Sequence, residues 1–375
     1  MEQTDITRAF GHNLRAARKK AGLTQEELAK RLGYSAKAIS KWESGSCVAP
    51  AVLLPLLAEQ LSTDVNSLMR ITRSPSYFVG IDGGGTKTEF VLAQKDGAIL
   101  RRVVLGGSNP NDLGMPACLE LLGRGIEELC RGIPRERISL FAGIAGCATG
   151  NNRESILQYL LTLGFGKCDC GSDVLNAIKA TLGEENGIVV IAGTGSITFV
   201  QKDRTRHRLG GFNYLFEDGG SGYMIGREAI YDALKAEENR TADSLLYRMV
   251  LEKCETKTVL DHLGKIYEGG KSKIASFAPL VFDAARVGDG RARQILDTNA
   301  AILAREITRS AAILEEPFPR VVLLGGLTRQ ADLLLPLIYS HLTIECRIEI
   351  HEGSLAKGAL MLAGWEEPHA ENRTT

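Results

Sequence analysis

A glycine-rich turn between two apolar segments constrains this chain more than any other feature. Residues 77–88 read YFVGIDGGGTKT, in which an apolar run ends in Asp82 and three glycines follow directly. The branched and aromatic residues before the aspartate are typical of a β-strand, and three successive glycines cannot continue one. A second strand is predicted at 89–93. The turn is therefore neither a dinucleotide fingerprint, which opens a helix, nor a P-loop, which ends in Gly-Lys-Ser/Thr.

The chemistry of this turn suits the phosphates of a nucleotide. Glycine N–H groups can approach oxygens closely and form an anion-binding concavity. Asp82 supplies a hard carboxylate suited to Mg²⁺, and the residues after the glycines add hydroxyls and a cation. The alternative is an ordinary glycine-rich hairpin turn. The strand, the acid and the threonines around the glycines favour phosphate binding, and the predicted set is Asp82, Gly83, Gly84, Gly85, Thr86 and Lys87.

Composition sets the broad class of protein. The 375 residues include 45 basic and 45 acidic side chains, and 44% are apolar, which is typical of a globular protein with two or three domains. The balanced charge means that any nucleic-acid-binding surface must be local. No apolar run approaches the ~20 residues of a membrane helix, and the polar N-terminus does not resemble a signal peptide. We therefore expect no membrane partner.

The eight cysteines are scattered along the chain. This distribution fits reduced thiols better than a disulfide framework, so we expect a cytoplasmic protein. Cys168 and Cys170 form the one close pair. No second Cys/His cluster lies near them in the sequence, which disfavours a metal site there.

The first 70 residues predict a bundle of short helices. Gly22 ends the first helix, and Thr24 begins the second with Glu27 three residues later, which is the pattern of a capping box. Ser35 caps a third helix at 36–43. Pro50 is predicted to start a fourth helix, and a fifth follows near residue 65.

The segments LTQEELA at 23–29, GYS at 33–35 and ISKWESG at 39–45 are together similar to the Cro/C1-type (XRE) helix-turn-helix family. That family places its third helix in the major groove and usually binds DNA as a dimer. The resemblance implies DNA as a partner and a homodimer. The alternative is a helical bundle used only for dimerisation. The residues expected to face DNA are Gln25, Ala36, Lys37, Ser40 and Lys41.

Residues 71–76 have little apolar content and one proline, which predicts a short linker before a second domain. The pattern from residue 77 onward alternates strands and helices. It predicts a three-strand meander at 78–81, 89–93 and 99–105, a helix at 117–130, a strand at 140–145, and helices at 155–163 and around 179–182.

Two further glycine clusters follow apolar strands. The apolar run 187–192 leads into Gly193-Thr194-Gly195-Ser196, and a strand resumes at 197–200. This is the same strand–turn–strand pattern as at the first glycine turn. The run 321–324 leads into Gly325 and Gly326 before a helix at 331–342. A strand end beside glycines is a platform for a flat base and its ribose.

Repeated Asp/Gly/Thr hairpins in α/β layers resemble the actin, hexokinase and heat-shock-chaperone ATPase fold. Within it, residues 77–365 look like the BadF/BadG-type ATPases and N-acetylglucosamine kinases. The resemblance rests on Asp82 through Lys87, Ser108-Asn109, Ser172-Asp173, Gly193 through Ser196, Asp218 through Gly222, and Gly325-Gly326.

The resemblance implies the fold class, which is an all-α helix-turn-helix bundle followed by a two-lobed α/β actin-like (ribonuclease H-like) ATPase domain. Lobe I would span about 77–185 together with the C-terminal helix, and lobe II about 186–350. Residues 366–375 would form a polar tail.

The same resemblance implies ATP and Mg²⁺ as cofactors and an amino sugar as substrate. Asp82 would hold the metal, and Asp173 would accept the proton of the sugar hydroxyl. The alternatives are that Asp173 caps a helix, that Asn109 is a turn residue and that Phe212 lies in the core. Phosphate contacts would also come from Thr194, Gly195 and Ser196, adenosine contacts from Gly325 and Gly326, and sugar contacts from Asn109, Asp173, Gly211, Phe212 and Asp218.

The chain departs from the family pattern at one position. Relatives carry an acid after the aspartate that corresponds to Asp218, and this chain has Gly219. The cluster-binding cysteines of the acyl-CoA dehydratase activators and the zinc loop of ROK-type repressors are not recognisable. We therefore expect an amino-sugar kinase fused to a DNA-binding module that regulates transcription. The rival hypothesis is a sugar- or nucleotide-sensing transcription factor without turnover.

Overall fold

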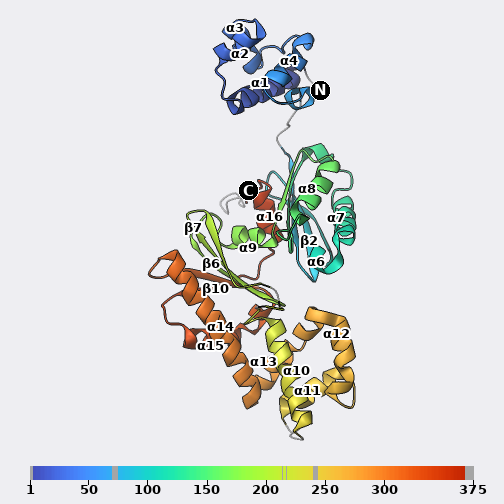
Figure 1. The fold of residues 1–375 in the computed structure, drawn as a ribbon, viewed down its shortest axis with the longest axis vertical. Coiled ribbons are helices and arrows are strands. Elements are labelled where there is room, and N and C mark those ends of the chain that lie inside the picture. The colour runs from blue at the N-terminus through green and yellow to red at the C-terminus, as the bar shows by residue number, and fades with distance from the viewer. Residues whose placement is uncertain (1–2, 70–74, 213, 217, 240–243, 368–375) are drawn as a thin grey trace, which may run out of the picture. The chain divides into compact units, whose positions relative to one another are not determined.

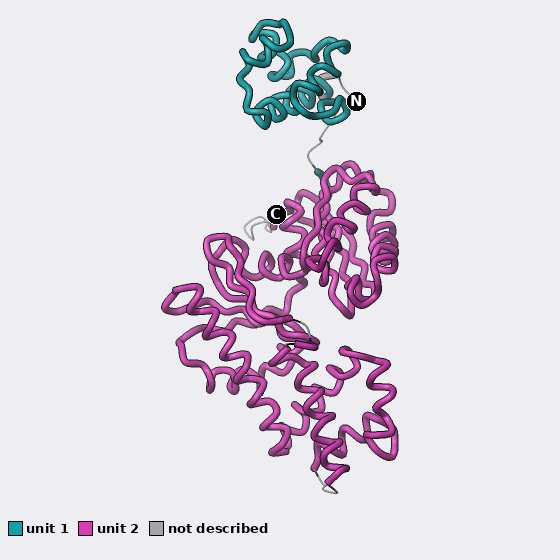
Figure 2. The backbone as a smooth tube through the Cα atoms, viewed as in Figure 1, with its two compact units in different colours: residues 1–76 teal, residues 77–375 magenta. Residues whose placement is uncertain are grey.

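The computed structural model describes residues 3–69, 75–212, 214–216, 218–239 and 244–367. The chain divides into two compact units, residues 1–76 and 77–375 (Figure 2). The linker expected at 71–76 lies outside the described residues apart from its last two, and so does the tail expected at 366–375 from residue 368 onward. None of the described helices combines the length and the apolar character needed to span a bilayer.

The first unit is a bundle of short helices around a small apolar core that includes Phe10, Leu28, Ile39 and Trp42. Thr24 and Glu27 form the predicted capping box, and Ser35 caps the third helix. The fourth helix begins later than predicted, because Pro50 is followed by a 3₁₀ turn. The elements are α1 (Gln3–Lys20), α2 (Gln25–Leu32), α3 (Ala36–Glu43), η1 (Ala51–Leu53), α4 (Leu54–Gln60) and α5 (Val65–Met69).

The second unit begins with a five-stranded sheet, here called the first sheet, in the order β3-β2-β1-β4-β5. The predicted meander forms its antiparallel part, and β4 and β5 join in parallel. Its strands are β1 (Tyr77–Gly83), β2 (Lys87–Gln94), β3 (Ile99–Gly106), β4 (Ile138–Ile144) and β5 (Lys167–Gly171).

Helices cover both faces of the first sheet (Figure 1). On one face, apolar residues of β1, β2 and β4 pack with those of α7 and α8. On the other face, Phe78 and Phe141 pack against Ala359 and Leu360 of α16, the last helix. The chain therefore returns to its first sheet near its end. The helices of this region are α6 (Pro110–Leu113), α7 (Met115–Leu129), η2 (Arg135–Arg137), α8 (Asn152–Thr162), α9 (Asp173–Thr181) and α16 (Ala356–Leu362).

A second five-stranded sheet has the order β10-β9-β6-β7-β8. Sequence reasoning finds its central strands, because they are nearly continuous apolar runs. It misses β8 and β10, which are short and carry charged residues. The strands are β6 (Gly187–Ala192), β7 (Ser196–Lys202), β8 (Thr205–Leu209), β9 (Arg320–Leu324) and β10 (Arg347–Ile350).

One face of the second sheet carries the largest core of the protein, formed with a group of long helices. Its other face packs against α9 through Ala177 and Ile178, and α9 also contacts the first sheet and α16. Helix α9 therefore joins the two sheets. The helices around the large core are α10 (Gly222–Glu238), α11 (Leu245–Cys254), α12 (Val259–Ala275), α13 (Ala278–Arg286), α14 (Gly290–Leu314), η3 (Gly326–Gln330) and α15 (Ala331–His341).

Candidate functional site

The first glycine turn, residues 83–86, connects the antiparallel strands β1 and β2 at the end of the first sheet. Two glycines allow close packing here, Gly83 of the turn and Gly107 of the segment that follows β3. A Cβ on Gly107 would overlap the carbonyl of Gly85, and one on Gly83 would strike the Ser108 hydroxyl. Ser108 N–H donates to the Gly84 carbonyl at 3.0 Å. The turn is thus held by the segment that follows β3, and Thr86 and Lys87 remain exposed.

Asp82 lies on β1 directly before this turn, and Asn176 of α9 holds its carboxylate. The Asn176 side-chain N–H group donates to Asp82 Oδ1 at 2.8 Å and to the Ile81 carbonyl at 3.1 Å. Asn176 is fully buried, and its own Oδ1 has no hydrogen-bond partner among the described residues. Sequence reasoning misses Asn176, because an asparagine inside a helical pattern gives no signal of what it contacts.

Asp173 is the first residue of α9, but it does not cap that helix. The cap is Ser172, whose hydroxyl accepts from the Val174 N–H and donates to Asp173 Oδ1 at 3.0 Å. This excludes the N-cap alternative for Asp173. Asp173 and Asn176 lie three positions apart, so one face of α9 presents both side chains.

Burial acts on both carboxylates, and the Asp173 charge acts on Asp82. Burial raises the pKa of Asp82 to about 7, the Asn176 amide opposes this rise, and the Asp173 carboxylate adds to it. Burial also raises the pKa of Asp173, against hydrogen bonds from Ser172 and the helix backbone. Two partly desolvated acids in this proximity attract a cation or a proton.

Asn109 lies on the loop after β3. Its side chain caps α6 by accepting from the Asn111 N–H at 3.0 Å, and it donates to Asp112 Oδ2 at 2.7 Å. The turn role considered from the sequence is therefore present. Gly146, after β4, packs its Cα against Asn109 Oδ1, since a Cβ there would overlap this oxygen.

The second glycine turn, Gly193 to Ser196, connects β6 and β7. Ser196 N–H donates to Asp218 Oδ1 and Ser196 Oγ donates to the Gly219 carbonyl, both at 2.6 Å. Lys271 of α12 lies on the same carboxylate, with its Nζ 2.7 Å from Asp218 Oδ2. Asp218 is thus buried against the second glycine turn. Sequence reasoning misses Lys271, which is distant in the chain and lies in no motif.

The remaining predicted residues of this half lie near the second sheet. Gly325 directly follows β9 and has φ of 105°, where a Cβ would strike Ala192, and Gly326 N approaches Gly193. Gly211 has φ of 68° and packs against Ile197. Phe212 is 56% exposed, which excludes the core alternative, and the Arg208 guanidinium lies 5.0 Å from its ring centre.

The helix-turn-helix unit presents most of its predicted residues on one helix. Lys37, Ser40 and Lys41 are exposed on α3, and Ala36 is half-buried at its start. Gln25 differs, because its Nε2 donates to Glu43 Oε2 at 2.8 Å. Glu43 in turn forms a buried ion pair with Arg18. Gln25 therefore connects the start of α2 to the end of α3.

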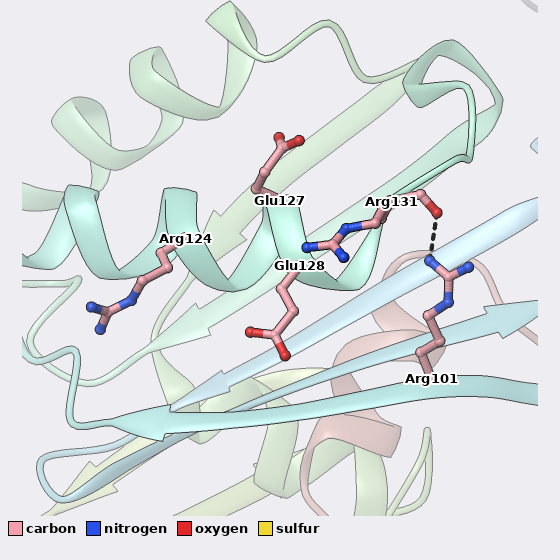
Figure 3. Close-up of a pocket in the computed structure, with 5 residues that line it drawn as sticks. All are labelled: Arg101, Arg124, Glu127, Glu128 and Arg131. Carbon is pink, nitrogen blue, oxygen red and sulfur yellow. Dashed lines mark hydrogen bonds between the residues drawn. The ribbon is translucent and has the colours of Figure 1, made fainter.

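A charged cavity lies elsewhere on the second unit, between α7 and β3 (Figure 3). Arg101 Nη1 donates to the Arg131 carbonyl at 2.6 Å within it. Arg101 pairs with Leu92, far along β2 from the first glycine turn. None of its lining residues was predicted as a site residue, and these are Arg101, Arg124, Glu127, Glu128 and Arg131.

Among the described residues, no three His, Cys, Asp or Glu side chains are grouped to enclose a metal ion. The environment of Asp82 nevertheless suits Mg²⁺, which usually takes only one or two carboxylates and keeps waters and phosphate oxygens as its other ligands. The hard carboxylate of Asp82 is desolvated beside Asp173, and a cation there would stabilise both charges.

Comparisons with known proteins match both units. The model of the BadF/BadG/BcrA/BcrD ATPase family matches residues 79–363, and a helix-turn-helix model matches residues 14–59. An N-acetylmuramic acid/N-acetylglucosamine kinase of Clostridium acetobutylicum is 31% identical over 268 residues, covering 69% of this chain and 87% of that protein. An N-acetyl-D-glucosamine kinase of Dictyostelium discoideum is 29% identical over 283 residues, covering 69% and 88%.

A solved structure agrees with these matches. The crystal structure of a candidate N-acetylglucosamine kinase from Chromobacterium violaceum has a TM-score of 0.65 and 27% identity, and it covers 78% of this chain and 100% of its own. The family match spans most of the chain, and the fold predicted from the glycine turns is confirmed. The protein carries a helix-turn-helix domain and belongs to the BadF/BadG/BcrA/BcrD ATPase family.

Proposed function

We propose that this protein is an ATP-dependent amino-sugar kinase, of the N-acetylglucosamine kinase kind, fused to a sequence-specific DNA-binding domain. The observation that carries the kinase proposal is the arrangement of Asp82, Asn176 and Asp173. Ser172 caps α9 and leaves the Asp173 carboxylate available to a substrate, while Asn176 fixes the carboxylate of Asp82. Relatives named as amino-sugar kinases support the substrate class.

The reaction assigns a separate role to each acid. Asp173 accepts the proton of a sugar hydroxyl, and the sugar oxygen then forms a bond to the γ-phosphorus of ATP. The bond between that phosphorus and the β,γ-bridging oxygen breaks, and ADP leaves. A general base contributes roughly 10²–10⁴-fold, and most of the remaining acceleration in phosphoryl transfer comes from positioning and charge neutralisation. Asp82 would hold Mg²⁺, which neutralises phosphate oxygens when bound.

The other predicted site residues keep their roles in this proposal. The first and second glycine turns face phosphates, and Gly325 and Gly326 face adenosine. The sugar contacts are Asn109, Gly211 and Phe212, together with Asp173. Asp218 is the exception among the predicted sugar contacts, because its carboxylate is enclosed and already contacts Ser196 and Lys271.

A coupled assay of ADP release over a panel of amino sugars tests the kinase proposal. The panel contains N-acetylglucosamine, N-acetylmuramic acid and glucosamine, with glucose as the comparison sugar that has no nitrogen substituent. We expect ADP release with at least one amino sugar and its loss in Asp173→Asn. ADP release with none of them, from protein that binds the sugar and MgATP, would reject the enzyme.

One observation favours the rival function of a sensor without turnover. A Cβ on Gly219 would lie 2.8 Å from Ile302 of α14, so the acid that relatives carry does not fit this packing without a shift. The packing of Ile302 against Gly219 therefore leaves no room for an acidic side chain at this position. Sugar binding that changes DNA affinity without ADP release would establish the sensor.

We further propose that the first unit binds DNA as a homodimer in the cytoplasm, with α3 in the major groove. The exposure of Lys37, Ser40 and Lys41 on α3 supports this orientation. All eight cysteines are free thiols, which supports a reducing compartment. Protection of an operator fragment by the full chain, at a stoichiometry of two chains per site, is the expected result. A single chain per site would contradict the dimer.

A further inference from the structure

Lys271 is a cation at the second glycine turn that the sequence motifs do not explain. Its Nζ lies 2.7 Å from Asp218 Oδ2. A Cβ on Gly195 would also lie 2.7 Å from this Nζ, so the ammonium group rests directly against the turn backbone. A side chain at position 195 would therefore displace the ammonium group from the turn.

The donors of Ser196 in this turn are already engaged within the protein. Ser196 N–H donates to Asp218 and Ser196 Oγ donates to Gly219, each at 2.6 Å. The predicted phosphate contact of Ser196 is therefore already used within the protein, and a nearby cation could supply a donor in its place. An ammonium group has three N–H donors and no acceptor, and the contact of Lys271 with Asp218 is an ion pair.

The two members of this ion pair differ in burial. The Asp218 side chain is 2% exposed, while that of Lys271 is 30% exposed. The carboxylate is thus enclosed, while part of the Lys271 side chain reaches solvent. The Lys271 Nζ also lies 5.9 Å from the ring centre of Tyr214.

Helix α12 is interrupted directly before Lys271. Gly270 has φ of 53° and ψ of −148° inside this helix, a conformation that residues with a Cβ rarely adopt. The break redirects the chain at the residue before Lys271. The following lysine on the same helix, Lys273, instead packs its stem beside Gly269.

We propose that Lys271 is a phosphate-binding residue of the nucleotide site, presented by the break at Gly270 and held at the second glycine turn by Asp218. The inference rests on the proposed function, because it takes the ligand of this turn to be the phosphates of ATP. In the ligand-free protein Asp218 balances the lysine charge. On nucleotide binding, N–H donors of Lys271 bind phosphate oxygens while the ion pair with Asp218 orients the ammonium group.

The test compares two ligands that differ only in their phosphates. Binding of adenosine and of AMPPNP with Mg²⁺ is measured by calorimetry for the full chain and for Lys271→Met, Lys271→Arg and the control Lys273→Met. A hydrogen bond to a charged group corresponds to a loss of roughly tenfold to a hundredfold in affinity. We expect this loss for AMPPNP in Lys271→Met, unchanged adenosine binding, partial recovery in Lys271→Arg and no change in Lys273→Met.

Unchanged AMPPNP affinity in Lys271→Met would overturn the proposal, and so would an equal loss for both ligands, because that would indicate a general structural role. If Lys271→Met does not fold, Asp218→Asn/Lys271→Met replaces it, since the double variant leaves no buried charge unpaired. If the wild-type protein binds no AMPPNP, the proposed function itself is rejected. If the wild type binds AMPPNP but Lys271→Met binds it equally well, only the role of Lys271 is rejected.

Discussion

Replacing Arg18 by methionine should destabilise the helix-turn-helix unit severely. Arg18 Nε and Nη2 donate to Glu43 Oε1 and Oε2 at 2.5 and 3.0 Å, and the two side chains are 10% and 3% exposed. Removing one partner of a buried ion pair costs roughly 3–5 kcal/mol, because the other charge remains buried. A unit of 76 residues is stable by only about 4–11 kcal/mol, at ~0.05–0.15 kcal/mol per residue.

Tryptophan fluorescence separates this unit from the rest of the chain. The protein has two tryptophans, Trp42 in the first unit and Trp365 in the second. In a Trp365→Phe background the thermal transition of Trp42 reports the first unit alone. A loss of about 3 kcal/mol corresponds to a fall of roughly 12 °C or more in the midpoint for a unit of this size.

A double variant provides the matched control. Arg18→Met/Glu43→Leu removes both charges, and replacing a buried pair by apolar residues is often neutral or stabilising. We therefore expect its midpoint to lie close to that of the wild type. A fall of less than about 4 °C in Arg18→Met would refute the reasoning, since it would put the cost of the unpaired Glu43 near or below 1 kcal/mol.

The same pair predicts a dependence on pH. Burial raises the pKa of Glu43, but hydrogen bonds from Arg18 and Gln25 lower it more, so the folded value lies below the ordinary 4.5. The stability from this depressed pKa is present above the ordinary value and is lost as pH falls through the folded one. We expect the Trp42 midpoint to fall as the pH is lowered below the ordinary value of 4.5, and to fall less in the double variant. Equal falls in both proteins would exclude Glu43 as the cause.

Three further predictions concern the sites. Asp173→Asn should lower phosphoryl transfer by roughly 10²–10⁴-fold while sugar binding stays unchanged, and full turnover would remove Asp173 as the base. Asn176→Ala should raise the Mg²⁺ concentration for half-maximal activity about tenfold or more, because a hydrogen bond to the Asp82 carboxylate is lost. In Asn176→Ala the KM for sugar should stay unchanged. Ser139→Ala, which also removes a buried polar group, is the control. An unchanged Mg²⁺ requirement in Asn176→Ala would contradict a role of Asn176 in positioning Asp82. Lys37→Ala and Lys41→Ala should each reduce the slope of log binding constant against log salt concentration, measured for DNA, by about one. Lys95→Ala is the control and should leave this slope unchanged. Unaltered slopes in the first two variants would place both lysines away from DNA.

Local patterns made much of this molecule predictable. The capping box at Thr24, the apolar run 187–192 and the glycines after Asp82 each specify structure through neighbouring residues, and the structure has these features where they were predicted. The family and its fold followed from the same motifs. Pro50 shows the limit, because a proline is compatible with the first turn of either a 3₁₀ or an α-helix.

The unpredicted features depend on contacts between distant segments. Asn176 acts on Asp82 from 94 positions away, and Lys271 reaches Asp218 through a helix break. Neither residue lies in a recognisable motif, and neither partner is near in the sequence. The helices α10 to α14 were also not predicted, because they pack mainly against one another and against one sheet face rather than around a motif.

The return of α16 to the first sheet has a consequence for synthesis on the ribosome. Ala356, Ala359 and Leu360 cover Phe78 and Phe141, and Ser139 Oγ donates to the Ala363 carbonyl at 2.6 Å. The helix-turn-helix unit is complete once about seventy residues have emerged. An apolar face of the first sheet, which holds Asp82, stays uncovered until α16 has been synthesised. Chains cut short by premature termination would thus retain a complete first unit, joined to a second unit with an exposed and aggregation-prone apolar surface.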